Sequence, residues 1–389
     1  MLGSALGYAM DGFDLLILGF MLPAIRAALH LSPEQAGALV TWTLVGAVVG
    51  GIGFGLLSDR FGRVRVLTWT IAVFALFTGL CAVARGFSDL LFYRTMAGVG
   101  LGGEFGIGMA LAAEACPPRE RARFSSYVAL GWQAGVLGAA LLTPLLLPFL
   151  GWRGMFALGL APALVAFVMR RTLSEPETFV RRTPERIGFA ERIKALFGDA
   201  HSIKSSAALF VLCSIQNFGY YGIMIWMPTF LCAKLGFSLT RSGMWTAVTV
   251  LGMMAGVWCF GQLADRVGRK PTFVLYQIGA AVTVVLYARL TQPASMLWAG
   301  AVMGAFVNGM VGGYGALLSE LYPTRARATA QNVLWNAGRA VGGLGPLVVG
   351  AIASRYSYPV AISTLAALYV LDIAATIFLV SERKGHALD

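Results

Sequence analysis

Charged residues are scarce in this chain. They make up only 12% of its 389 residues, whereas hydrophobic residues make up 58%. Soluble domains carry roughly 25% charged residues, and the mean hydropathy of +0.73 agrees with the deficit. The composition therefore excludes a soluble globular protein and indicates an integral membrane protein. At about 30 residues for each helix and its loop, the length allows roughly a dozen spans.

Cysteine and histidine are also rare, with five and three residues respectively. The cysteines form no Cys-x-x-Cys motif and lie in or beside apolar runs, where thiols act as small buried residues rather than as a disulfide or metal framework. The histidines His30, His201 and His386 fall in expected loops or in the tail. We therefore expect no metal site and no cofactor.

Twelve apolar windows of about 20 residues are long enough to cross a bilayer. The longest polar stretch, residues 170–204, follows the sixth window. The pattern predicts an all-α membrane protein with six-helix bundles at 1–170 and 205–389, joined by a loop at 171–204. The windows lie at 4–25, 36–57, 66–86, 89–113, 124–149, 152–170, 206–232, 243–264, 272–290, 294–318, 328–353 and 358–380.

The net charge of +12 follows from the predicted topology. Of the 30 Lys and Arg residues, 21 fall in the loops after even-numbered windows or in the C-terminal tail. Such residues concentrate in cytoplasmic loops. Both termini and the 171–204 loop are therefore predicted to be cytoplasmic, in the inner (plasma) membrane. A nucleic-acid partner is not needed to explain the charge, and the start of the chain has no cleavable-signal pattern.

The two halves repeat one another at a constant offset of 206 residues. The segment GLLSDRFGRVRVL at 55–67 corresponds to GQLADRVGRKPTF at 261–273. Parallel repeats of six spans are a known transporter architecture, with the substrate site between the halves. The offset also relates more distant pairs, which are Gly98 with Gly304, Glu114 with Glu320, and Arg121 with Arg327.

These repeated segments carry the pattern Gly-x-Leu-x-Asp-Arg-x-Gly-Arg, in which the next position is usually basic but is Val64 in the first copy. On this pair of motifs the sequence resembles the major facilitator superfamily over essentially its whole length. The resemblance implies the twelve-helix fold of that family and a cytoplasmic gate that governs alternating access. The implied gate residues are Asp59, Arg60, Arg63, Asp265, Arg266 and Arg269.

Three further segments indicate a narrower likeness. The segment MDGFDLLILG in the first window looks like the signature of proton symporters for aromatic acids. Residues 94–108 and 320–346 look more like the branch that carries sialate, lactate and similar acids. Both branches import carboxylate anions with protons, and the motifs do not choose between them.

Three carboxylates at bilayer depth are candidates for proton coupling. A charge at such a depth costs about 2.5–3.5 kcal/mol on insertion scales. Asp11 and Asp14 share one helix face, and a buried pair of this kind can bind and release a proton near neutral pH. Asp14 is slightly preferred because it lies deeper. Glu104 is predicted to be a proton relay or the partner of an arginine, with an interhelical structural bond as the alternative. Asp372, in the last window, is expected to be structural.

Two arginines inside windows are candidates for binding an anion. Arg339 lies near the middle of its window, where its guanidinium can hold a carboxylate bidentately; its alternative role is a salt bridge that locks the two halves. Arg94 is the second candidate, with a snorkelling side chain as its alternative. The other predicted substrate contacts are polar or aromatic residues inside windows: Asn332, Trp335, Asn336, Asn217, Tyr220, Tyr221, Trp132, Gln133 and Asn308.

These features predict a secondary transporter and not an enzyme. We expect a monomer that takes up an organic acid anion, either an aromatic acid or a small hydroxy or sugar acid, together with protons. One alternative is a proton-driven exporter, which is disfavoured because the fifth window lacks a Gly-Pro-x-x-Gly-Gly motif. Another is a membrane sensor that keeps the fold without transporting.

Overall fold

The computed structural model describes residues 2–31, 33–114, 116–161, 164, 194, 196–237, 239–323 and 326–382. Within these ranges every regular element is helical. Most of the predicted sixth window and of the predicted 171–204 loop lies outside them.

The first bundle contains α1 (Leu2–Leu29), α2 (Pro33–Phe61), α3 (Arg63–Leu80), α4 (Phe87–Glu114) and α5 (Arg121–Leu158), with short 3-10 turns at Cys81–Val83 and Pro118–Glu120. Within this bundle the most extensive helix contacts are those of α2 with α4 and of α1 with α5. Gly50 makes the first contact possible, because a Cβ there would lie 1.8 Å from the Val99 carbonyl oxygen. The α5 helix bends at Gly151, where φ is +60°, and this bend falls between the predicted fifth and sixth windows.

The second bundle contains α9 (Ala200–Leu235), α10 (Leu239–Val267), α11 (Arg269–Arg289), α12 (Pro293–Gly309), α13 (Val311–Leu321), α14 (Arg327–Gly342), α15 (Gly345–Arg355) and α16 (Tyr358–Leu379). Two predicted windows are interrupted. The window at 294–318 divides into α12 and α13 at Met310, and the window at 328–353 divides into α14 and α15 at Gly343 and Leu344.

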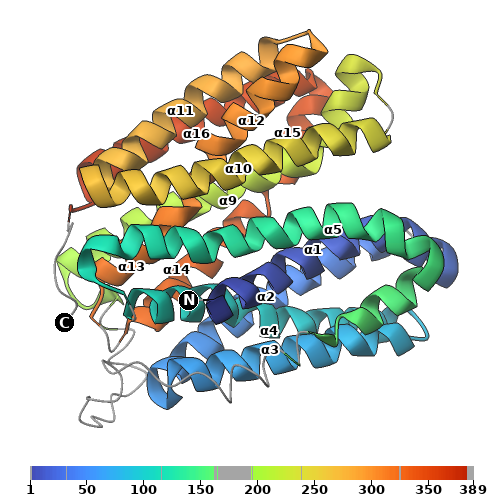
Figure 1. The fold of residues 1–389 in the computed structure, drawn as a ribbon, viewed down its shortest axis with the longest axis horizontal. Coiled ribbons are helices and arrows are strands. Elements are labelled where there is room, and N and C mark those ends of the chain that lie inside the picture. The colour runs from blue at the N-terminus through green and yellow to red at the C-terminus, as the bar shows by residue number, and fades with distance from the viewer. Residues whose placement is uncertain are drawn as a thin grey trace.

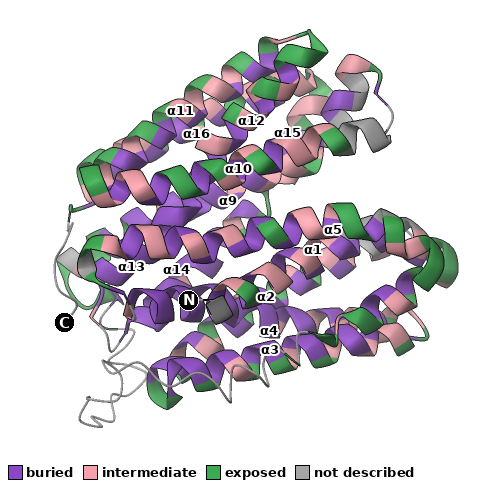
Figure 2. Ribbon diagram, in the orientation of Figure 1, coloured by how far each residue is buried: buried purple, intermediate pink, exposed green. Residues whose placement is uncertain are grey.

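The outer surface of both bundles suits a lipid environment. Large apolar side chains such as Phe149, Trp298 and Phe378 are exposed there, and Figure 2 shows exposed residues along the outward faces of α3, α10 and α11. Within the described ranges, nine helices are long and apolar enough to cross a membrane.

The bundles meet along several pairs of helices. The α2 helix packs on α14, and α5 packs on α10 and α13 (Figure 1). On α2, Gly51 and Gly55 face Asn336 and Asn332 of α14 so closely that a Cβ would lie 2.1 Å and 2.8 Å from those side chains. We call the end of the molecule that holds residues 58–63, 114, 116–123, 264–270, 319–323 and 326–329 the motif end.

Candidate functional site

A pocket of about 300 Å³, part of it open to solvent, lies between the bundles. Helices from both bundles contribute to it, namely α1, α5, α9, α12, α13 and α14. Its lining combines aromatic rings, side-chain amides and one charged residue. The lining residues are Tyr8, Trp132, Gln133, Gln216, Asn217, Tyr220, Tyr221, Asn308, Val311, Trp335 and Arg339.

Arg339 is the charged residue of this lining. Its side chain is 3% exposed, and its guanidinium carbon lies 5.6 Å from the ring centre of Trp132. It donates a hydrogen bond to the hydroxyl of Tyr8. Among the described residues no carboxylate forms an ion pair with it, and its Nε has no partner. A buried guanidinium remains charged, so this geometry suits an anion that arrives from outside the protein.

Aromatic rings form the walls of the pocket and hold one another in place. Trp335 stacks on Phe105 with a centroid distance of 4.0 Å. Tyr8 packs on Trp132 at 5.1 Å, and the Trp132 indole donates a 3.2 Å hydrogen bond to the Tyr220 hydroxyl. These contacts join α1 and α5 of one bundle to α9 of the other. A flat, partly apolar ligand would fit between such walls.

Several polar atoms of the lining have no hydrogen-bond partner within the described structure. Buried polar groups are usually paired, so these atoms are free to meet a ligand or water. They are Gln133 Oε1, Gln216 Oε1, Asn308 Nδ2, Trp335 Nε1 and Arg339 Nε.

Arg94 does not line the pocket, because Asp14 holds it elsewhere. Its two terminal nitrogens donate to the two Asp14 oxygens at 3.0 and 2.8 Å, and Thr78 donates to the same carboxylate at 3.2 Å. Both charged side chains are buried, so the snorkelling alternative for Arg94 is wrong.

Asp11 and Glu104 form a second pair on the same two helices. Their carboxyl groups lie in hydrogen-bonding contact with each other. None of their four oxygens accepts a hydrogen bond from another described group. Gly7 leaves the space for Glu104, since a Cβ there would lie 2.8 Å from Oε2. Glu104 is therefore not the partner of Arg94, and its partner is a second acid.

Besides Arg94, two predicted substrate contacts lie outside the pocket. Asn336 donates to the Gly102 carbonyl of α4 at 3.0 Å, and Asn332 donates to Ala328 of its own helix at 3.0 Å. Both pack against glycines of α2. The predicted polar stripe of α14 thus divides, with Trp335 and Arg339 facing the pocket and the two asparagines facing the first bundle. The remaining predicted contacts, Asn217, Tyr220, Tyr221, Trp132, Gln133 and Asn308, all line it.

At the motif end, Asp59 and Arg63 join the first bundle to the second. Arg63 pairs with Asp59 on its own side and with Glu114 at 3.1 Å. Asp59 accepts hydrogen bonds from the backbone and hydroxyl of Thr329, in the first turn of α14. A carboxylate at this position satisfies amide groups that the helix leaves unpaired and complements its dipole.

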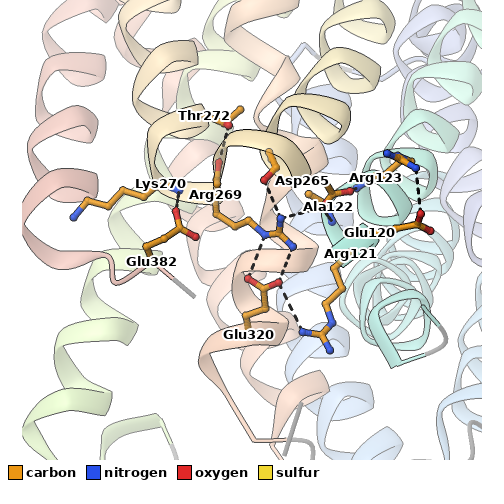
Figure 3. Close-up of polar contacts among 12 residues, drawn as sticks. Glu120, Arg121, Ala122, Arg123, Asp265, Arg269, Lys270, Thr272, Glu320 and Glu382 are labelled. Atoms are coloured by element: carbon orange, nitrogen blue, oxygen red, sulfur yellow. Dashed lines mark hydrogen bonds and ion pairs between the residues drawn. The ribbon is translucent and has the colours of Figure 1, made fainter. Parts of the chain in front are cut away.

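The second copy of the motif forms the equivalent contact in the opposite direction, from the second bundle to the first (Figure 3). Arg269 pairs with Asp265 at 2.9 Å and with Glu320 at 2.8 Å. Asp265 accepts hydrogen bonds from the Ala122 and Arg123 amides, at 3.1 and 2.9 Å, in the first turn of α5. Each bundle therefore caps a helix of the other. We call these two sets of contacts the latches.

The latches contain residues that sequence reasoning did not assign to the gate. Glu114 binds Arg327 of the opposite bundle at 3.1 Å, and Glu320 lies 3.8 Å from Arg121. The offset of 206 residues had related both pairs, and it relates Thr329 to Arg123 as well. Two predicted gate residues, Arg60 and Arg266, are exposed and stand beside these buried contacts.

The comparisons with known proteins decide the family. The model of the Major Facilitator Superfamily matches residues 4–263 and 233–388. The chain belongs to this superfamily. It is thus a multi-pass membrane transporter of metabolites, with twelve helices in two related six-helix bundles.

Individual relatives agree with this assignment. A Haemophilus influenzae protein named as a metabolite transport protein is 65% identical, over 100% of this chain and 97% of that protein. The cis,cis-muconate transport protein of Acinetobacter baylyi is 30% identical, over 97% and 93%. Among solved structures, the proton:xylose symporter XylE gives a TM-score of 0.84 at 19% identity, covering 100% of this chain and 96% of that one.

Proposed function

We propose that this transporter takes up an organic acid anion together with protons, by alternating access around the pocket. The observation that carries the proposal is Arg339, a buried guanidinium in the pocket with no carboxylate partner among the described residues. A carboxylate can satisfy its fork of donors, and the aromatic walls suit the body of an unsaturated or cyclic acid. Relatives named for cis,cis-muconate and niacin transport support this class of substrate.

The proposed orientation places the motif end in the cytoplasm, with both termini, in the inner membrane. The excess of Lys and Arg in the loops at this end supports it. The domain boundaries remain as proposed from the sequence, at 1–170 and 205–389 with a loop between them. The two latches then close the cytoplasmic end in the described conformation.

Proton coupling is proposed for the carboxylates of α1 and α4, namely Asp11, Asp14 and Glu104. Two observations support this proposal. All three carboxylates are buried, and within the described structure the oxygens of Asp11 and Glu104 accept no hydrogen bond from a donor group. The proton that binds with the anion offsets the anion's charge, which lowers the cost of closing the loaded centre. Release of the proton to the cytoplasm then frees the anion.

A flux assay tests this proposal. Purified protein in vesicles is given labelled nicotinate, cis,cis-muconate or 4-hydroxybenzoate with an inward proton gradient. We expect accumulation that collapses when a protonophore is added. Arg339→Ala should reduce uptake at least 100-fold, because each charge-assisted bond is worth about 1.5–3 kcal/mol. Arg339→Lys should restore only part of it, because an ammonium cannot bind bidentately.

The outcomes separate the alternatives. Binding without flux contradicts a transporter of these acids and favours a sensor. Flux that an outward proton gradient drives favours an exporter. Equal uptake by the parent and Arg339→Ala contradicts the role of Arg339.

A further inference from the structure

The contact between Asp11 and Glu104 has a simple electrostatic requirement. The two side chains are 1% and 2% exposed, and they touch each other rather than a cation or a donor. Two ionised carboxylates in such contact repel each other strongly when both are buried. One proton between them turns the contact into a hydrogen bond. The geometry is therefore that of a pair holding a single proton.

Asp14 has a different environment, although it lies less than one helical turn further along α1. Arg94 holds both of its oxygens, and Thr78 adds a third hydrogen bond. A carboxylate held in this way has its negative charge compensated by Arg94. The preference for Asp14 as the proton carrier therefore shifts to Asp11 and Glu104.

The carboxyl pair is joined to the pocket through Tyr8. This residue lies one turn before Asp11 on α1, lines the pocket and accepts the hydrogen bond from Arg339. Its ring is fixed between Phe105 and Trp132, at 5.3 and 5.1 Å. The charge on Asp11 also acts directly on Arg339.

Few other titratable groups face this arrangement. From α1 and α4 they are Asp14 and Arg94, which neutralise each other. From α9 they are the hydroxyls of Tyr220 and Tyr221. Arg339 is thus the positive charge that responds when the carboxyl pair gains or loses its proton.

Resting on the proposed function, we propose that the Asp11–Glu104 pair carries the exchangeable proton and thereby controls Arg339. With the proton bound, the pair has one negative charge and Arg339 is free to hold the substrate carboxylate. When the proton leaves to cytoplasmic water, the second negative charge draws Arg339 toward Asp11 and competes with the substrate. Tyr8 is the positioning residue that keeps the guanidinium between its two alternative partners.

Infrared difference spectroscopy of the purified full chain tests the pair without any substrate. Between low and high pH, the parent should lose one protonated-carboxyl stretching band. Asp11→Asn and Glu104→Gln should each remove that change. Asp372→Asn is the matched control, since Asp372 is also a fully buried aspartate but belongs to α16, which does not line the pocket. The proposal is overturned if the change persists in both pair variants or disappears only in Asp14→Asn.

Binding of nicotinate, cis,cis-muconate and 4-hydroxybenzoate across pH tests the control of Arg339. For the parent, affinity should fall about tenfold per pH unit above the titration of the pair, as for any single linked proton. Asp11→Asn should keep the high affinity seen at low pH and lose the pH dependence. Tyr8→Phe keeps the ring and removes the hydroxyl, so it should flatten the profile without unfolding the protein.

Failure of this inference differs from failure of the proposed function. A parent that binds anions with a flat pH profile overturns the control of Arg339 even if uptake follows the proton gradient. A parent that shows no gradient-driven uptake overturns the proposed function, while the infrared change still decides whether the pair holds the proton.

Discussion

At the scale of single residues, two aspartates three positions apart have opposite roles. Asp14 neutralises Arg94, whereas Asp11 meets another acid. Removing one partner of a buried ion pair leaves an uncompensated charge, which typically costs about 3–5 kcal/mol. An amide in place of the Asp11 carboxyl can donate to Glu104 as the protonated acid does, so the net charge of the pair is unchanged.

We therefore predict that Asp14→Asn strongly lowers the thermal unfolding temperature in detergent, whereas Asp11→Asn leaves it unchanged or raises it. Adding Arg94→Met to Asp14→Asn should recover much of the loss, since it removes the unpaired charge. Equal unfolding temperatures for the two single variants would show that the two aspartates are equivalent.

These charged residues could be singled out from the sequence, but their pairing could not be predicted from it. Intramembrane charges stand out because each is costly, so Asp11, Asp14, Arg94 and Glu104 were all identifiable. Which acid meets Arg94 depends on how α1 and α4 are rotated about their axes. That rotation is set by packing at positions such as Gly7, where the need for space becomes visible only with the neighbouring helix in place.

At the scale of elements, hydropathy located the spans well, because twenty apolar residues have few alternatives to a membrane helix. It did not locate the breaks at Met310 and at Gly343–Leu344. Hydropathy averages over a window and is insensitive to such a break, at which the dihedral angles of Met310, Gly343 and Leu344 stay in the right-handed helical region. Both breaks fall in spans that contribute residues to the pocket.

The packing of α2 on α4 allows a matched test on one helix. At Gly50 a Cβ would lie 1.8 Å from the Val99 carbonyl oxygen, whereas at Gly53 nothing lies within 4 Å. We predict that Gly50→Ala separates the helices and lowers the unfolding temperature by many degrees. Gly53→Ala should be neutral or stabilise by about 0.5–1 kcal/mol, as expected for alanine in a helix interior. Similar effects of both changes on thermal unfolding would contradict this packing.

At the scale of the whole molecule, the two latches stabilise the same state, which is the conformation closed at the motif end. Both lie at the motif end, and each joins the bundles through a carboxylate that caps a helix of the other bundle. Opening this end must break both sets of contacts together. The repeat therefore divides the stability of the closed state between two equivalent places.

Weakening either latch should shift the protein toward the conformation that is open at the motif end. Losing a charged helix cap costs about 0.5–2 kcal/mol, which corresponds to a change of up to roughly 30-fold in a two-state ratio. Ser126 reports on opening, because it is fully buried against Gly261 and Gly312 of the other bundle.

We predict that a Ser126→Cys reporter reacts slowly with a polar thiol reagent, in a background without other reactive cysteines. Asp59→Ala and Asp265→Ala should each accelerate the reaction by a similar factor, and together by about the product of the two factors. Arg60→Gln should leave the rate unchanged, since Arg60 is exposed and its guanidinium lies over the Phe61 ring of its own helix. A faster reaction in Arg60→Gln would show that Arg60 does belong to the gate. Unchanged rates in both aspartate variants would show that the latches do not stabilise the closed state.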